Sequence, residues 1–201
     1  EANHNAMIPE SLLLEYGATL ESLPPDELIF SEKTDARFYY QIKTGKIKMF
    51  NLNESGREFI QGLFADGDSF GEPPLFADIK YPASAATVKQ SEFYKLSKEK
   101  LMDLLGEHPK IGLKFTRAMA KRLYYKAMIL NEITNHPPEH RILTLIDYLK
   151  KKHGTTEAYK VKLTRQQIAD LTGLRVETVI RAVKQLEQDG EIEIIKRKVF
   201  R

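Results

Sequence analysis

The chain has 201 residues, of which 42% are hydrophobic and 29% charged, as in an ordinary globular protein of one or two domains. It contains no cysteine, which excludes disulfides, thiolate zinc sites, cysteine-ligated iron–sulfur clusters and cysteine nucleophiles. We see no apolar run near the roughly 20 residues that cross a bilayer and no secretory leader, so we expect a cytoplasmic protein without membrane contact.

The net charge of +3 hides an uneven distribution along the chain. Residues 1–100 carry a net charge of −5, whereas residues 101–159 and 160–201 each carry +4. The C-terminal half can therefore attract a polyanion, because lysine and arginine release counterions when they neutralise phosphates. A solvated basic surface explains the same charge equally well.

Residues 38–96 have the pattern of short β-strands. Runs rich in aromatic and β-branched residues, such as residues 38–42 and 46–50, alternate with glycines. This spacing predicts a β-roll, barrel or sandwich.

The period of the pattern then becomes helical. Ser97 is a predicted N-cap, and Pro109 ends the helix that follows it. Residues 110–134 predict one long helix with apolar residues on both faces, which favours pairing with a second copy over packing along the β unit. Residues 135–138 (Asn-His-Pro-Pro) form a hinge, and a further helix begins at Glu139.

The hinge also carries two histidines, His136 and His140. They could bind a metal ion, but two ligands fall short of the three or four that a zinc site needs. We therefore expect solvated loop residues here and no metal site.

Residues 163–183 have the pattern of a helix-turn-helix. Thr164 can cap the first helix with Gln167 at the capping-box position. Gly173 lies where the turn needs a positive φ, and Val179 and Val183 begin the buried stripe of the second helix. In this motif the second helix lies in the major groove of DNA.

The polar residues of the motif suit contact with DNA. Arginine can bond bidentately to guanine and glutamate can accept from cytosine, and Glu177 and Arg181 share one helix face. The alternative is an i,i+4 salt bridge on an exposed helix; the complete motif around the pair favours DNA. We expect these residues to contact DNA: Thr164, Arg165, Gln166, Arg175, Glu177, Thr178, Arg181 and Lys184. Residues 191–200 predict a β-hairpin wing with basic residues for the phosphate backbone.

Residues 67–72 (Gly-Asp-Ser-Phe-Gly-Glu) and residues 164–183 together resemble the Crp/Fnr family of bacterial transcription regulators. The resemblance implies an α+β fold: a double-stranded β-helix of the jelly-roll or cupin-like kind (residues 1–109), a dimerisation helix (110–134) and a winged helix-turn-helix (135–201). It also implies a homodimer on a palindromic DNA site, contact with RNA polymerase, and an N-terminal signal that repositions the reading helices.

The resemblance also implies a base preference. Glu177 and Arg181 match the family residues that recognise the G·C pair of a TGA core. The cyclic-AMP receptor branch has arginine directly before the glutamate, but Val176 stands there, as in the branch of the fumarate–nitrate regulator. That branch usually has serine before the arginine, where this chain has Ile180. We expect a TTGA-like half-site.

The effector residues of the family are incompletely matched. Its cyclic-nucleotide site corresponds to Gly71, Glu72, Ala83, Ser84 and Lys126 here. The family arginine that pairs with the cyclic phosphate is missing, since no arginine occurs between Arg57 and Arg117, and an unpaired buried phosphate is costly. We therefore expect no tight cyclic-AMP binding, no cofactor, and a small-molecule effector that is unidentified if one exists.

Three alternatives stay open. An enzyme with a regulatory β-roll lacks support, since we find no catalytic motif and expect no catalytic residue. A ligand-binding or dimerisation module with degenerate DNA readout, and a true cyclic-nucleotide-responsive regulator, are the other two.

Overall fold

The structure, a computed structural model, describes residues 6–54, 56–152, 154 and 158–201. The chain divides into two compact units, Glu1–Lys121 and Arg122–Arg201. The division falls inside the long helix α4 (Pro109–Asn135), so this helix contributes to both units. The domain bounds expected from the family resemblance, 1–109, 110–134 and 135–201, lie near the two ends of the same helix.

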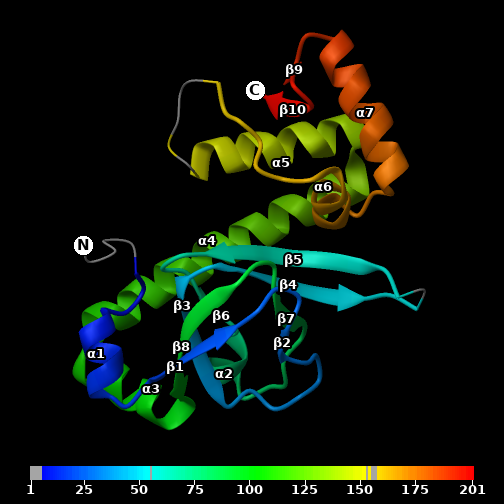
Figure 1. Ribbon diagram of the computed structural model, residues 1–201. Coiled ribbons are helices and arrows are strands. Elements are labelled where there is room, and N and C mark those ends of the chain that lie inside the picture. Colours follow the sequence, from blue (N-terminus) through cyan, green and yellow to red (C-terminus); the bar gives the residue numbers. More distant parts are fainter. Residues whose placement is uncertain (1–5, 55, 153, 155–157) are drawn as a thin grey trace. The chain divides into compact units, whose positions relative to one another are not determined.

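The first unit is built on two four-stranded antiparallel sheets, with strand orders β1-β8-β3-β6 and β2-β7-β4-β5 (Figure 1). The strands are β1 (Thr19–Leu23), β2 (Leu28–Phe30), β3 (Phe38–Thr44), β4 (Lys46–Leu52), β5 (Glu58–Ala65), β6 (Ser69–Phe70), β7 (Ser84–Thr87) and β8 (Ser91–Ser97). The expected strands between residues 38 and 96 are present. We missed β1 and β2, because each is an edge strand whose side chains are mostly exposed or half-buried and show no strong alternation.

Aromatic rings fill much of the core that both sheets share. The rings of Tyr40 and Phe70 stack with centroids 5.2 Å apart, and Phe93 meets Tyr40 edge-on at 5.9 Å. Phe30 and Tyr81 stack at 3.8 Å. These pairs join β2, β3, β6, β8 and the segment before β7, so they hold the roll together across long sequence separations.

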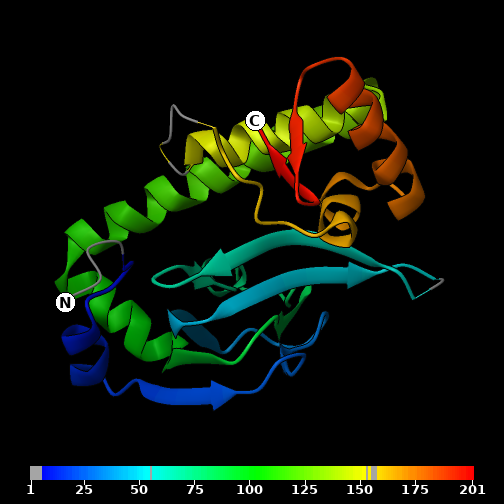
Figure 2. The same cartoon turned by 45° about the horizontal axis from the view of Figure 1, so that its top comes forward.

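Helices close one end of the roll. α1 (Glu10–Glu15) and α3 (Lys98–Glu107) lie side by side in Figures 1 and 2, while the short α2 (Pro73–Ala77) follows β6. Ser97 caps α3 by accepting a hydrogen bond from the backbone N–H of Lys100, as predicted, and α4 starts at Pro109. One apolar cluster joins α1, α3, the start of α4 and the sheet: Ile8, Leu13, Tyr39, Leu96, Leu101, Leu104, Ile111 and Phe115.

The second unit contains the end of α4, α5 (Pro138–Lys152), α6 (Arg165–Thr172), α7 (Val176–Gln188) and a hairpin of β9 (Glu193–Ile195) and β10 (Lys198–Phe200). Its core is formed by buried residues of α5, α6, α7 and β10: Ile142, Leu145, Ile146, Ile168, Ala169, Leu171, Val179, Val183, Leu186 and Val199. The chain before α6 continues the hairpin, because the backbone N–H of Val161 donates to the carbonyl of Val199 at 2.9 Å. The unit is the expected winged helix-turn-helix, and the molecule is α+β.

Arg201 fastens the wing to α5. Its guanidinium donates to both carboxylate oxygens of Asp147, at 2.6 and 3.2 Å, and to the carboxylate of Glu191 at 2.7 Å. These two acids raise the pKa of Arg201, so its charge is permanent. The contacts tie the segments on both sides of the hairpin to one helix.

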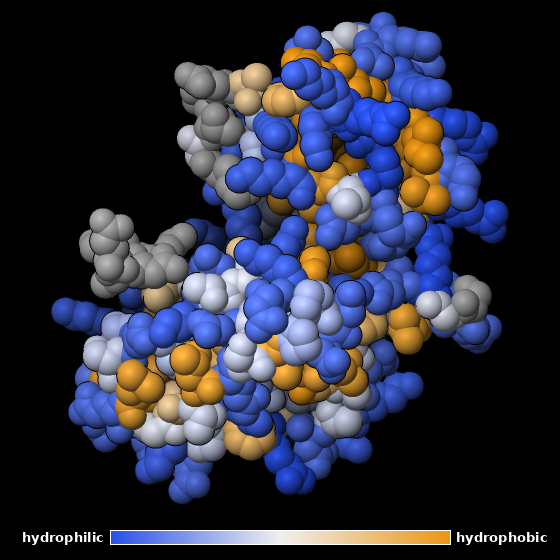
Figure 3. Space-filling view, viewed as in Figure 1, coloured by the Kyte–Doolittle hydropathy of each residue, from blue (hydrophilic) through white to orange (hydrophobic). Residues whose placement is uncertain are grey.

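The surface shown in Figure 3 is mainly hydrophilic, with hydrophobic atoms in separate patches. Among the described residues, no helix is both long enough and apolar enough to cross a membrane.

Candidate nucleic-acid interface

The first helix of the motif, α6, begins with the predicted capping box. The hydroxyl oxygen of Thr164 accepts from the backbone N–H of Gln167 at 3.0 Å, and the Gln167 side-chain oxygen accepts from the backbone N–H of Thr164 at 3.1 Å. Gly173 ends the helix with φ of 69°, the left-handed conformation that the turn was predicted to need. The backbone N–H of Leu174 then bonds to the carbonyl of Ala169 and closes the turn.

The second helix, α7, has a buried and an exposed side. Val179, Ala182, Val183 and Leu186 are each at most 2% exposed, and they fix the rotation of the helix about its axis. Glu177, Arg181 and Lys184 lie on the exposed side, with Thr178 half-buried. The motif therefore presents a polar face that its own core leaves open.

Arg175, one of the residues expected to contact DNA, lies just before the second helix. It is the N-cap of α7, with an extended backbone (φ −79°, ψ 149°), because the helix begins only at Val176. Its exposed side chain therefore leaves from the turn between the two helices. Glu177 lies in the first turn, where its charge is favourable to the helix dipole.

Glu177 and Arg181 do not form the salt bridge that was the alternative explanation for their spacing. Both side chains are exposed, and in the described part of the chain neither has an ion-pair or hydrogen-bond partner. Their donors and acceptors are consequently available to an external ligand. Gln166, by contrast, donates its amide to Asp170 at 2.8 Å.

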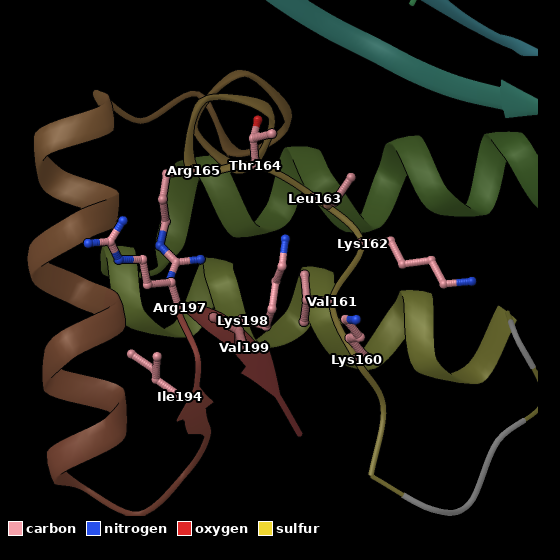
Figure 4. Close-up of a pocket in the computed structure, with 10 residues that line it drawn as sticks. All are labelled: Lys160, Val161, Lys162, Leu163, Thr164, Arg165, Ile194, Arg197, Lys198 and Val199. Atoms are coloured by element: carbon pink, nitrogen blue, oxygen red, sulfur yellow. The ribbon is translucent and has the colours of Figure 1, made fainter. Parts of the chain in front are cut away.

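A basic pocket lies between the start of α6 and the wing (Figure 4). Its volume is about 580 Å³, and none of the ten described residues that line it is acidic. The cationic lining residues are Lys160, Lys162, Arg165, Arg197 and Lys198. In Figure 4 the side chains of Arg165 and Arg197 approach one another beside α7, while Lys162 points away from them. Converging cations without a neighbouring acid are suited to hold an anion such as a phosphate.

Burial lowers the pKa of Arg165, which lies at the first position of α6. The cost of keeping this guanidinium charged falls when an anion binds beside it. Sequence reasoning chose Arg165 and the basic wing but missed Lys160 and Lys162. Their signal was the alternation of basic and apolar residues over 159–163, typical of a strand with one solvent face.

The wing reaches this pocket through a strained loop. β9 and β10 pair antiparallel and are connected by Lys196 and Arg197, whose φ angles are 48° and 64°. A two-residue hairpin loop of this kind favours glycine or asparagine. The chain keeps two cationic residues there instead, and one of them lines the pocket.

The residues matched to an effector site lie in two places. Gly71, Glu72, Ala83 and Ser84 belong to the first unit, and the exposed Lys126 belongs to the second. Glu72 is 1% exposed, and its carboxylate accepts a short hydrogen bond from the hydroxyl of Ser69. Ala83 is 2% exposed, and the hydroxyl oxygen of Ser84 accepts from the backbone N–H of Glu32 at 2.9 Å.

Aromatic rings crowd the region around Gly71. This residue has φ of 75°, and a Cβ there would lie 3.1 Å from the ring of Phe30 and 3.4 Å from that of Tyr81. Tyr81 is 2% exposed and donates its hydroxyl to the carbonyl of Phe38. Lys80 and Lys89, the lysines nearest to Ser84 in the sequence, are both exposed.

Comparison with known proteins identifies both units. Residues 20–108 match the cyclic nucleotide-binding domain model, and residues 140–200 match the Crp-like helix-turn-helix domain model. The chain is 23% identical to the regulatory protein HlyX of Actinobacillus pleuropneumoniae, over 84% of the chain and 71% of that protein. It is 29% identical to the cAMP-activated global transcriptional regulator CRP of Pasteurella multocida, over 80% of the chain and 78% of that protein.

The fold is shared with solved structures. The structure of the c-di-GMP responsive global regulator CLP of Xanthomonas campestris matches this one with a TM-score of 0.77 at 21% identity. The match covers 94% of this chain and 98% of that chain. These relatives are regulators of transcription and not enzymes. With a cyclic nucleotide-binding-like domain followed by a Crp-like helix-turn-helix, the chain belongs to the Crp/Fnr family of DNA-binding transcription regulators.

Proposed function

We propose that this regulator binds a palindromic DNA site with TTGA-like half-sites as a homodimer and responds to a signal other than cyclic AMP. The observation that carries the DNA part is the exposed face of α7, where Glu177 and Arg181 have no partner among the described residues. The basic pocket beside it supplies cations for the phosphate backbone. Base edges and phosphates can thus be contacted from one surface.

The homodimer proposal rests on an exposed stripe along α4. Positions spaced alternately three and four residues apart are all exposed: Leu113, Thr116, Ala120, Leu123, Ala127, Leu130 and Thr134. Leu123 is 71% and Leu130 64% exposed, although both are large and apolar. This spacing is that of a coiled-coil seam, which a second copy of the helix would bury.

The half-site is tested by selecting random DNA with the purified protein and sequencing what binds. TTGA-containing palindromes should dominate, and Arg181→Ala should weaken binding to them by roughly 10- to 100-fold, as the loss of one bidentate base contact does. Gln188→Ala, on the same helix but far from its N-terminus, is the matched control and should bind as the parent does. Dominance of TGTGA sites would contradict the half-site.

The pairing is tested by native mass spectrometry. Leu123→Glu should convert the dimer to a monomer, because it places a charge in the seam, while Lys121→Glu, which lies off the stripe, should leave the dimer intact. A monomeric parent protein would contradict the proposal.

Three features support the proposal that cyclic AMP is not the signal. The family arginine is absent, the rings of Phe30 and Tyr81 stack on each other beside Gly71, and Lys48, in the sheet that contains Phe30, is paired with Glu58 at 2.6 Å. A cyclic phosphate beside Gly71 would thus meet aromatic rings, with no arginine to pair with it. Calorimetric titration with cyclic AMP should show no complex of micromolar or tighter affinity, and such a complex would refute this part.

A further inference from the structure

Three side chains able to bind a metal ion meet where α4 ends and α5 begins. They are Glu132 in the last turn of α4, His136 just after it, and His140 in the first turn of α5. One ligand atom from each lies within 4.8 Å of the others. The carboxylate of Glu132 is 2.7 Å from Nδ1 of His140, and the two imidazole rings stack with centroids 4.1 Å apart.

The backbone between the two helices brings these residues together. Glu132 and His136 are four residues apart and share one side of the helix end. The prolines at 137 and 138 end α4 and start α5, which returns His140 to the same place. Arg141 holds the turn, because its Nε donates to the carbonyl of His136 at 2.8 Å. All these residues lie within the second compact unit.

One of the three groups is a nearly buried carboxylate. The side chain of Glu132 is only 7% exposed, and its ion-pair partner His140 is a half-exposed imidazole that carries charge only when protonated. A buried carboxylate is costly without a compensating positive charge, and buried charges are paired or coordinate metals. A divalent ion held by the three groups would supply a positive charge beside this carboxylate.

We propose that Glu132, His136 and His140 bind a divalent transition-metal ion, with Zn²⁺ as the ion that this donor set fits best. Two imidazole nitrogens and one carboxylate oxygen are a known zinc ligand set, which leaves a fourth position for water. Ligand atoms in such a site lie about 3.3 Å apart, given metal–ligand distances of about 2.0–2.1 Å. The three groups reach this arrangement by side-chain rotation, which the partial exposure of both histidines permits.

The sequence alone predicts solvated loop histidines and no metal site here. Only two ligands are apparent in it, because Glu132 lies in the long helix and only the turn places its carboxylate beside His140. A bound ion would join the end of α4 to the start of α5 and hold these helices at one angle. Its effect on DNA binding rests on the proposed function, whereas metal binding itself does not.

The site is tested by titrating the metal-stripped full chain with Zn²⁺, using calorimetry and competition with a chromogenic chelator. We expect one ion per chain with micromolar or tighter affinity and a rise in Tm of several degrees at saturating ion. His140→Ala and Glu132→Gln should each lower the affinity at least tenfold, while His108→Ala, outside the cluster, should leave it unchanged. Co²⁺ in place of Zn²⁺ should give the intense visible absorption of a tetrahedral site.

Absence of uptake, or uptake that His140→Ala and Glu132→Gln do not weaken, would overturn the proposal. If Glu132→Gln fails to fold, His140→Ala alone decides, because that residue is half-exposed and its loss is tolerated more readily. A mobility-shift titration with and without Zn²⁺ tests the link to DNA. Uptake of the ion without a change in DNA affinity would retain the site and remove the link, and a protein that binds Zn²⁺ but no DNA would refute the proposed function alone.

Discussion

A substitution at the tip of the wing should change stability and DNA binding in opposite directions. Arg197 has φ of 64°, in the left-handed region that costs a residue other than glycine about 1–2 kcal/mol. Arg197→Gly removes this strain but gives the unfolded chain more freedom, so we expect a net gain of about 1 kcal/mol in the free energy of unfolding. For a unit of this size the gain corresponds to roughly 4–8 °C in Tm, measurable by calorimetry.

The same substitution removes one cation from the basic pocket. Each phosphate neutralised by a protein contributes about 0.9 to the slope of log affinity against log salt concentration. We therefore expect Arg197→Gly to lower that slope by about 0.9 per chain, measured by fluorescence anisotropy with a TTGA palindrome at several potassium chloride concentrations. The protein becomes more stable and binds DNA less tightly.

Lys196→Gly is the matched control. Lys196 has a comparable backbone conformation, with φ of 48°, but does not line the pocket. It should raise Tm similarly and leave the salt slope nearly unchanged. Equal losses of slope in both variants would refute the assignment of the pocket to phosphate binding, and a fall in Tm in both would refute the strain argument.

Three further substitutions test the local structure. Thr164→Ala removes the capping box of α6 and should lower the free energy of unfolding by about 1 kcal/mol in denaturant titrations, whereas Thr164→Ser should retain the cap. Equal stability of both variants would contradict the cap. Gly71→Ala forces a Cβ to 3.1 Å from Phe30 at φ of 75° and should cost about 1–3 kcal/mol, and an unchanged denaturation midpoint would contradict the crowding. Burial raises the pKa of Tyr81 to about 12, above the value of about 10 in unfolded chains. The buried neutral phenol therefore contributes fully to stability below about pH 10, and this contribution is lost as the pH rises toward about 12. Tyr81→Phe should remove one late-titrating phenol from the absorbance titration at 295 nm, and an unaltered titration curve would contradict the raised pKa.

The second unit could be predicted closely from the sequence because its signals are local. The capping residues Thr164 and Gln167 are three apart, and Gly173 marks the turn by a backbone requirement that few other residues meet. Val179 and Val183 reveal the buried stripe of α7 by spacing alone. Each of these features is decided within a few residues, so tertiary context had little room to override it.

The first unit was less predictable because its decisive contacts join distant segments. The stack of Phe30 on Tyr81 connects residues about fifty positions apart, and neither residue marks its partner in the sequence. The same reason hid the carboxylate of Glu132 beside His140, across a turn whose geometry only the structure supplies. Edge strands β1 and β2 escaped because solvent covers much of their surface and weakens the pattern.

The basic C-terminal half has two explanations, a surface that attracts a polyanion or a surface that is only solvated, and the ion pairs of the two units bear on this choice. In the first unit several lysines are neutralised by neighbouring acids, as Lys48 is by Glu58 and Lys95 by Glu21. In the described part of the second unit, the five cations that line the basic pocket form no ion pair, whereas Arg201, outside it, binds two acids. Solvation alone does not explain why these cations lie apart from the acids of the same unit. If each of these five cations neutralises one phosphate, the salt slope is about 4.5 per chain, which is large enough to measure.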